Sequence, residues 1–181
     1  MKPIVITPNP VLTVPARTVT SFDKRLAKLI SDMKATLRAA KNPKGVGLAA
    51  PQIGEPWRVF LTRPTEKIEI CVFINPEILT RSDKLTDGVP ERDNKLEGCL
   101  SIPKIWGRVK RTQELTLKYQ DEASGFHTEK FSGFLATIVQ HETDHTNGVL
   151  FVQRVLEQKG KLYQSTRDEE GKEILEEVTV T

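Results

Sequence analysis

The sequence is poor in cysteine, with only Cys71 and Cys99 among 181 residues. Two cysteines cannot form the disulfide framework typical of small secreted domains. No apolar run approaches the roughly 18 residues of a membrane span. Residues 1–8 lack the apolar core and small-residue cleavage site of a signal peptide. We therefore expect a cytosolic protein that makes no contact with a membrane.

The sequence also lacks a strong charge of one sign. Its 27 basic and 24 acidic side chains leave a net charge of +3, too small an excess to indicate sequence-specific binding of nucleic acid. The basic residues within 104–118 are expected on a solvated surface, with a weak anionic contact such as ribosomal RNA as the alternative. Length and a hydrophobic content of 38% are typical of one globular domain over residues 1–181, although residues 156–181 are harder to assign.

Apolar residues at helical spacing predict two helices. The first is expected over residues 21–40, with a Thr or Ser cap, and is ended by Asn42-Pro43-Lys44-Gly45. The second is expected from Phe134 through His145, with Ser132 as its cap and Asn147-Gly148 as its stop.

Strands are expected over residues 57–62, 69–74 and 115–120, the second of them closed by Asn75-Pro76. Residues 174–180 are compatible with a strand, a short helix or a loosely held end. Because helices and strands do not alternate regularly, the pattern favours an α+β fold over a doubly wound sheet.

His141-Glu142-Thr143-Asp144-His145 is an H-E-x-x-H pattern on the second predicted helix. Residues four apart lie on one face of a helix, so both imidazoles can reach one ion with Glu142 beside it as a general base. The alternative is an exposed helix with two ordinary histidines. The preceding turn is strongly apolar, however, and buried unpaired imidazoles are costly. The pattern therefore predicts a metallohydrolase.

The spacing of residues leaves the third metal ligand open. Catalytic sites commonly use three protein ligands and keep the fourth position for water. No His or Cys follows His145, so acidic residues of the tail such as Glu157 and Asp168 are candidates. Cys99 offers a thiolate, a strong ligand, although a lone Cys is more often a small buried hydrophobic residue. Cys71 fits that second description and is assigned no role.

Three segments resemble the signature motifs of the peptide deformylase family, complete and in the family's order. They are Gly45-Val46-Gly47-Leu48-Ala49-Ala50-Pro51-Gln52, Glu97-Gly98-Cys99-Leu100-Ser101 and Gln140-His141-Glu142-Thr143-Asp144-His145. Shorter likenesses at residues 9–12, 73–77 and 148–151 extend the resemblance over approximately residues 4–155. The resemblance selects Cys99 as the third ligand.

The resemblance implies an α+β fold in which antiparallel β-sheets pack around a central helix that carries the H-E-x-x-H motif. It implies removal of the formyl group, as formate, from the N-terminal N-formylmethionine of newly synthesised polypeptides in the bacterial cytoplasm, or alternatively in an organelle. Nascent N-formylmethionyl peptides are thus the expected partners, with a transient ribosome contact. It also implies one divalent metal ion, natively Fe²⁺, with Zn²⁺ or Ni²⁺ able to bind; ligand chemistry alone would suit zinc equally well.

Roles in metal binding and proton transfer also follow from the resemblance. Cys99, His141 and His145 would hold the ion. Glu142 would accept a proton from the attacking water and later give it to the departing amine. Asp144 is expected only to support these residues.

The remaining implied roles concern the peptide. The side chain of Gln52 and the backbone N–H of Leu100 would stabilise the developing oxyanion. Gly45, Val46 and Gly47 would let the peptide backbone approach closely and pair with it as a strand does.

The sequence departs from the family mainly after Gln153, because many bacterial members continue into a C-terminal helix and this tail is acidic and interrupted by glycine. Two other functions are each compatible with part of the sequence. A zinc endopeptidase would leave Gln52 and Cys99 without a role, and a catalytically inactive scaffold would be expected to lack a ligand or the base.

Glu97 is expected to pair with an arginine such as Arg111.

Overall fold

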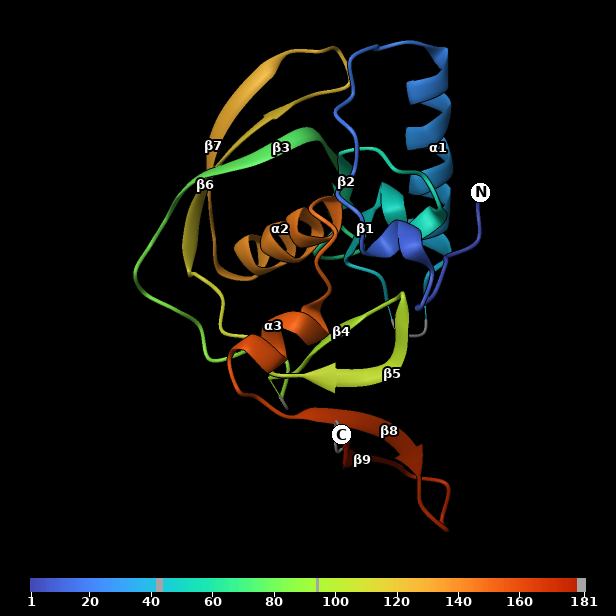
Figure 1. Cartoon of the computed structure of the whole chain (residues 1–181), viewed down its shortest axis with the longest axis vertical. Helices are drawn as coiled ribbons and strands as arrows, with labels where there is room; N and C mark the ends of the chain where they lie inside the picture. Colours follow the sequence, from blue (N-terminus) through green and yellow to red (C-terminus); the bar gives the residue numbers. More distant parts are fainter. Residues whose placement is uncertain (42–43, 94, 179–181) are drawn as a thin grey trace.

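The computed structural model describes residues 1–41, 44–93 and 95–178 (Figure 1). Asn42-Pro43 and the end of the tail after Val178 lie outside the described residues. The described strands form two antiparallel sheets, and the helices are α1 (Lys24–Ala39), α2 (Gly133–Thr146) and α3 (Phe151–Glu157). The α+β class with antiparallel sheets is confirmed. Among the described residues, no helix is long and apolar enough to cross a membrane.

The larger sheet has five strands in the order β1-β2-β3-β6-β7, and every neighbouring pair is antiparallel. Their bounds are Gly47–Ala49 (β1), Val59–Thr62 (β2), Cys71–Arg81 (β3), Glu114–Gln120 (β6) and Phe126–Ser132 (β7). The smaller sheet has the order β4-β5-β8-β9. Its bounds are Glu97–Cys99 (β4), Ile102–Gly107 (β5), Leu162–Arg167 (β8) and Glu173–Val178 (β9).

Helix α2 lies between the two sheets in the ribbon, with β3 and β6 on one side and β4 and β5 on the other (Figure 1). It contacts β1, β2, β6 and β7 of the larger sheet. Ser132 occupies the predicted cap position, but its hydroxyl makes no capping hydrogen bond. The predicted stop is present, because Gly148 has a φ of +73° and a Cβ there would meet the Val14 carbonyl carbon at 2.8 Å.

Helix α1 begins later than predicted, at Lys24. Asp23 caps it, because its carboxylate accepts hydrogen bonds from the N–H groups of Arg25 and Leu26. The stripe that predicted the helix is buried in a cluster with residues of β1, η2 (Ala50–Ile53) and β2. Its members are Leu26, Leu29, Ile30, Met33 and Leu37.

Strand β3 does not end at Asn75-Pro76 as predicted but runs on to Arg81. A bulge between Ile74 and Glu77 accommodates the proline, which cannot donate to the ladder. Asn75 takes a positive φ of 52° there, and its side chain both accepts from the N–H and donates to the carbonyl of Val19. Cys71 begins this strand and is exposed, not buried as expected.

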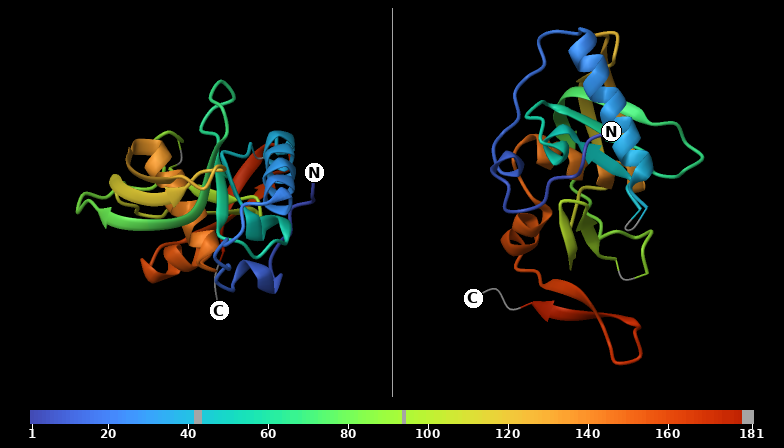
Figure 2. Two further views of the ribbon diagram at one scale, coloured as in Figure 1. Left: turned by 90° about the horizontal axis from the view of Figure 1, so that it is seen from above. Right: turned by 90° about the vertical axis from the view of Figure 1, so that its right-hand side faces the viewer.

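The tail forms a hairpin of β8 and β9. Of the three conformations compatible with the sequence, residues 174–178 therefore adopt the strand. β8 pairs with β5, from Ile105↔Gln164 to Gly107↔Leu162. The hairpin extends away from the rest of the chain (Figure 2). The tail, where the sequence departs from the family pattern, is therefore an antiparallel extension of the smaller sheet.

Candidate active site

Helix α2 and strand β4 bring together three side chains of the types that can bind a metal ion. The ring centroids of His141 and His145 lie 4.9 Å apart, as expected for positions one turn apart. The Sγ of Cys99 lies 3.2 Å from Nε2 of His145. One donor atom from each of these three side chains lies within 4.8 Å of the other two. Two imidazoles and one thiolate this close together fit a single divalent ion with one coordination position left over.

Cys99 is held at the end of β4, where the pairing with β5 shifts register between Gly98 and Cys99. Its sulfur receives a 3.4 Å contact from the N–H of Ser101 and another of 3.4 Å from the side-chain amide of Gln52. Cys99 is 5% exposed. Two N–H donors directed at this buried sulfur fix its position beside the histidines, and a cysteine sulfur binds metal as the thiolate.

Glu97 orients the first histidine. Its Oε1 accepts a hydrogen bond from Nδ1 of His141 at 2.6 Å, which leaves Nε2 of that ring free for a metal. Burial opposes a charge on His141, but the neighbouring Glu97 carboxylate raises the pKa of the ring well above its usual value. A metal at Nε2 would take the place of the second proton, and the same carboxylate makes the neutral ring a stronger ligand.

The expected pairing of Glu97 with Arg111 is confirmed. The guanidinium of Arg111 donates to both carboxylate oxygens, at 2.8 and 2.7 Å, and also to Oδ2 of Asp144 at 3.0 Å. Burial disfavours the charged form of Glu97, yet these bonds and the charge of Arg111 lower the pKa of the carboxyl. Arg154 donates to the other oxygen of Asp144 at 2.8 Å. This buried network fixes the position of α2 relative to β4.

His145 differs from His141 in its surroundings. It is 1% exposed, and among the described residues its Nδ1 has no hydrogen-bond partner. Burial and the proximity of His141 lower the pKa of His145 well below its usual value, so the ring is neutral. A neutral imidazole is the ligating form.

Glu142 lies beside these donors and is 3% exposed. Burial raises the pKa of this carboxyl to about 7. Among the described residues, its Oε2 has no hydrogen-bond partner, although it is buried. A carboxyl with a pKa near neutrality and a free oxygen is suited to accept and return a proton.

Strand β1 passes directly over this base. A Cβ built on Gly47 would lie 2.7 Å from Cδ of Glu142, so any larger residue would require the carboxylate or the strand to move. The Val46 carbonyl accepts a 2.7 Å hydrogen bond from the N–H of Arg63, which ties this segment to the end of β2. β1 is an edge strand, so one of its sides pairs with no other strand of the sheet and offers backbone groups that an extended chain could pair with.

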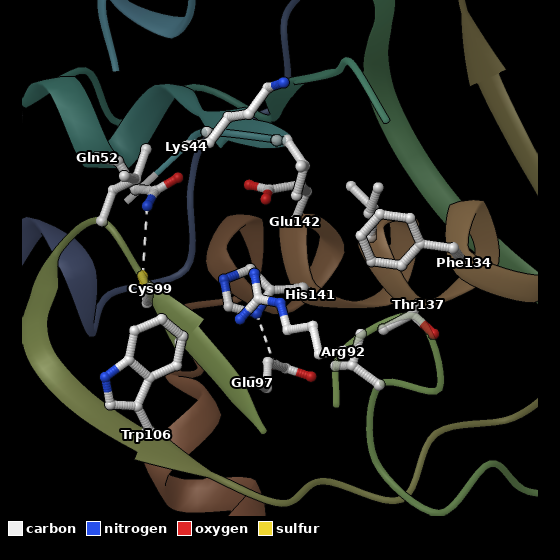
Figure 3. A pocket seen from close by; sticks show the side chains of 17 residues that line it. Lys44, Gln52, Arg92, Glu97, Cys99, Trp106, Phe134, Thr137, His141 and Glu142 are labelled. Atoms are coloured by element: carbon white, nitrogen blue, oxygen red, sulfur yellow. Dashed lines mark hydrogen bonds and ion pairs between the residues drawn. The ribbon is translucent and has the colours of Figure 1, made fainter. Parts of the chain in front are cut away.

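A pocket opens onto this arrangement (Figure 3). All but one of the residues predicted for the site line it: Gly45, Val46, Gly47, Gln52, Cys99, Leu100, His141 and Glu142. The exception is His145, which is not among the lining residues. The Oε1 of Gln52 accepts from the N–H of Ala49 at 2.8 Å, which turns its amide nitrogen towards Cys99.

Several lining residues were not predicted. They are Lys44, Val89, Arg92, Gly98, Trp106, Phe134, Thr137 and Ile138. The last three share a face of α2 with His141, at intervals of three and four residues, and this spacing could have identified them. Val89 and Arg92 come from the segment before β4, and no periodicity marks them.

Other candidates lie elsewhere. Glu157 pairs with Arg154 at 3.0 Å, and Asp168 accepts from the N–H groups of Glu170 and Lys172 in the β8–β9 turn. His127 bonds Asp121 at 2.6 Å on the β6–β7 hairpin, as expected of a surface histidine. Among the described residues, none of these three joins the Cys99, His141 and His145 group.

The chain is similar in sequence to proteins of one family. The family model described as Polypeptide deformylase matches residues 1–161. A peptide deformylase of Mesorhizobium japonicum is 40% identical over 158 residues, which cover 86% of this chain and 84% of that protein. One of Bartonella henselae is 42% identical over 156 residues, covering 84% and 82%.

Solved structures of peptide deformylases are also similar to this chain. The crystal structure of peptide deformylase from Thermotoga maritima matches with a TM-score of 0.75 at 36% identity, over 85% of this chain and 97% of that chain. A class I type b peptide deformylase from Acinetobacter baumannii, with Met-Ala-Ser bound, matches with a TM-score of 0.74 at 34% identity, over 85% and 98%.

Proposed function

The chain belongs to the peptide deformylase family, hydrolases that remove the N-formyl group from nascent polypeptides, and from this we propose the residues that perform the reaction. Cys99, His141 and His145 hold one divalent metal ion. Their convergence within 4.8 Å supports this assignment. The bound ion supplies Lewis-acid chemistry, because it acidifies water and polarises a carbonyl group. We propose Fe²⁺ as the native ion, with Zn²⁺ or Ni²⁺ able to occupy the same ligands.

Glu142 is the general base. Its carboxylate accepts a proton from the attacking water and returns it to the amine that leaves, so that formate and a free N-terminus are released. A pKa of about 7, raised by burial, suits both steps at neutral pH. The base is held between Gly47 and the histidines, within reach of water in the pocket.

Gln52 and the backbone N–H of Leu100 stabilise the oxyanion that develops on the formyl group. The Gln52 amide points at Cys99, so its second N–H lies beside the ligand group. Donors fixed before the reaction are worth about 3 kcal/mol each in comparable sites.

The formyl-methionyl peptide lies along β1, with Gly45, Val46 and Gly47 against its backbone. The open edge of the sheet supports this placement. A related protein has been solved with Met-Ala-Ser bound. We further propose that the protein acts in the bacterial cytoplasm on chains that emerge from the ribosome, through a transient contact.

The observation that carries this assignment is that a base and two metal donors line one pocket, with the third donor, His145, within 4.8 Å of the other two. The test is to purify the protein without oxygen, measure its metal content and incubate it with formyl-Met-Ala-Ser and with Met-Ala-Ser. We expect formate from the first peptide and no cleavage of either peptide's internal bonds. Cleavage of internal bonds in both would indicate an endopeptidase, and absence of formate would refute the proposed function.

A further inference from the structure

The guanidinium of Arg92 places a positive charge in the wall of the pocket. None of the roles proposed above involves this charge. Arg92 lies with Trp106 on the side of the pocket opposite Lys44 (Figure 3). Its guanidinium donates one hydrogen bond, from Nη1 to the carbonyl of Leu96 at 3.1 Å. Among the described residues, no carboxylate forms an ion pair with it. The remaining N–H groups of a guanidinium are therefore available to a ligand.

The indole ring of Trp106 lies against the guanidinium of Arg92. The Cζ of Arg92 lies 5.3 Å from the centre of the indole ring, within the range of a cation–π contact. The ring in turn lies against Gly98, its partner across β4 and β5, where a Cβ would meet the ring carbon Cζ3 at 2.6 Å. The indole therefore packs on the backbone of β4, with the guanidinium of Arg92 over its ring.

Among the described residues, no ion pair with an acidic side chain balances the charge of Arg92. Glu97 is the acidic group whose charge acts on Arg92, and Arg111 and His141 already occupy its oxygens. Burial lowers the pKa of Arg92 from its usual value, against the attraction of Glu97. An arginine that has lost water without gaining a carboxylate gains most from binding an anion, and its planar N–H groups match a carboxylate.

We propose that Arg92 is a specificity-determining residue that binds a carboxylate of the peptide substrate beyond its formyl-methionine. This inference rests on the proposed function, because it assumes that a formylated peptide occupies the pocket. The carboxylate has two sources. It belongs either to an acidic side chain at the second or third residue or to the C-terminus of a short peptide.

The experiment compares kcat/KM for peptide pairs that differ only in this group. The pairs are formyl-Met-Asp-Ser-amide with its Asn counterpart, formyl-Met-Ala-Asp-amide with its Asn counterpart, and formyl-Met-Ala-Ser as free acid and as amide. We expect a preference of about tenfold for the charged member of at least one pair, the effect of one charge-assisted interaction. The pair that shows it identifies the source.

Arg92→Gln should abolish that preference, and Arg92→Lys should keep only part of it, because lysine retains the charge without the planar donors. Arg167→Gln is the matched control, since this arginine is exposed on β8. Equal rates within every pair in the unmodified protein, or a preference that survives in Arg92→Gln, would overturn the proposal. The neutral amides report deformylation itself, so their failure to release formate would refute the proposed function and the role of Arg92 with it.

Discussion

The carboxylate of Glu97 lies 2.6 Å from Nδ1 of His141, with only 6% and 11% of the two side chains exposed. A ligating imidazole needs its distal N–H satisfied if its other nitrogen is to stay directed at the metal. We expect Glu97→Gln to weaken metal binding by about 10- to 100-fold, because the acceptor loses its charge and its hold on Arg111. Competition with a fluorescent chelator measures this. Glu176→Gln, at an exposed position of β9, should bind metal as the unmodified protein does. Equal affinity in both variants would contradict the role of Glu97.

Arg111 should contribute to stability more than to chemistry. Arg111→Met leaves Glu97 and Asp144 buried with one cationic partner fewer, and removal of one member of a buried ion pair typically costs about 3–5 kcal/mol. Urea denaturation should show this as a lower midpoint. Arg81→Met removes an exposed arginine of β3 and should change the free energy of unfolding by less than about 0.5 kcal/mol. Equal midpoints for the two variants would show that the network does not stabilise the fold.

α1 and α2 could be predicted from the sequence because they depend on local periodicity, whereas α3 was not predicted and the antiparallel pairing of the sheets was expected only from the family resemblance. The apolar stripe of α1 and the spacing of His141 and His145 are local properties of the chain. The start of α1 was wrong because a stronger acceptor, Asp23, lies just beyond the predicted serine cap. β3 was predicted too short because a bulge at Asn75 lets a strand continue past a proline.

The site was less accessible to sequence reasoning, because its parts are distant in the chain. Periodicity gave no third ligand, and only the resemblance of residues 97–101 to a family motif selected Cys99. The pairing of Glu97 with Arg111 was expected from charge and is confirmed. The position of Arg92 over Trp106 could not be predicted, since it depends on how an irregular segment folds back onto β5.

Replacement of the base tests the proton transfer alone. Glu142→Gln keeps the size of the side chain but cannot accept a proton, so we expect kcat to fall by about 10²- to 10⁴-fold. Metal content should not change, because Glu142 is not among the converging donors. Glu157→Gln, on the exposed side of α3, serves as the control. Activity within tenfold of the unmodified protein would exclude Glu142 as the base.

The two cysteines provide a matched pair for the metal site. Cys99→Ser replaces a thiolate by a hydroxyl that stays protonated at neutral pH, so we expect less metal by elemental analysis and lower activity. Cys71→Ser makes the same chemical change at an exposed position and should leave both unchanged. Full metal content in Cys99→Ser would refute the thiolate ligand.

The close approach of Gly47 to Glu142 can be tested by adding one methyl group. A Cβ on Gly47 would lie 2.7 Å from Cδ of the base, so either the carboxylate or β1 must move. Because β1 is paired with β2, we expect the carboxylate to be displaced. Gly47→Ala should therefore lower kcat at least about tenfold, or ~1.4 kcal/mol of transition-state stabilisation, while metal content is retained.

A double-mutant cycle distinguishes this displacement from a general loss of fold. Once Glu142→Gln has removed the base, the methyl group at position 47 has no proton transfer left to disturb, so the two losses should be far from additive. If Gly47→Ala instead acted through the fold or through peptide binding, it would reduce kcat/KM by the same factor in both backgrounds. An additive cycle would show that the contact between Gly47 and the base has no part in catalysis.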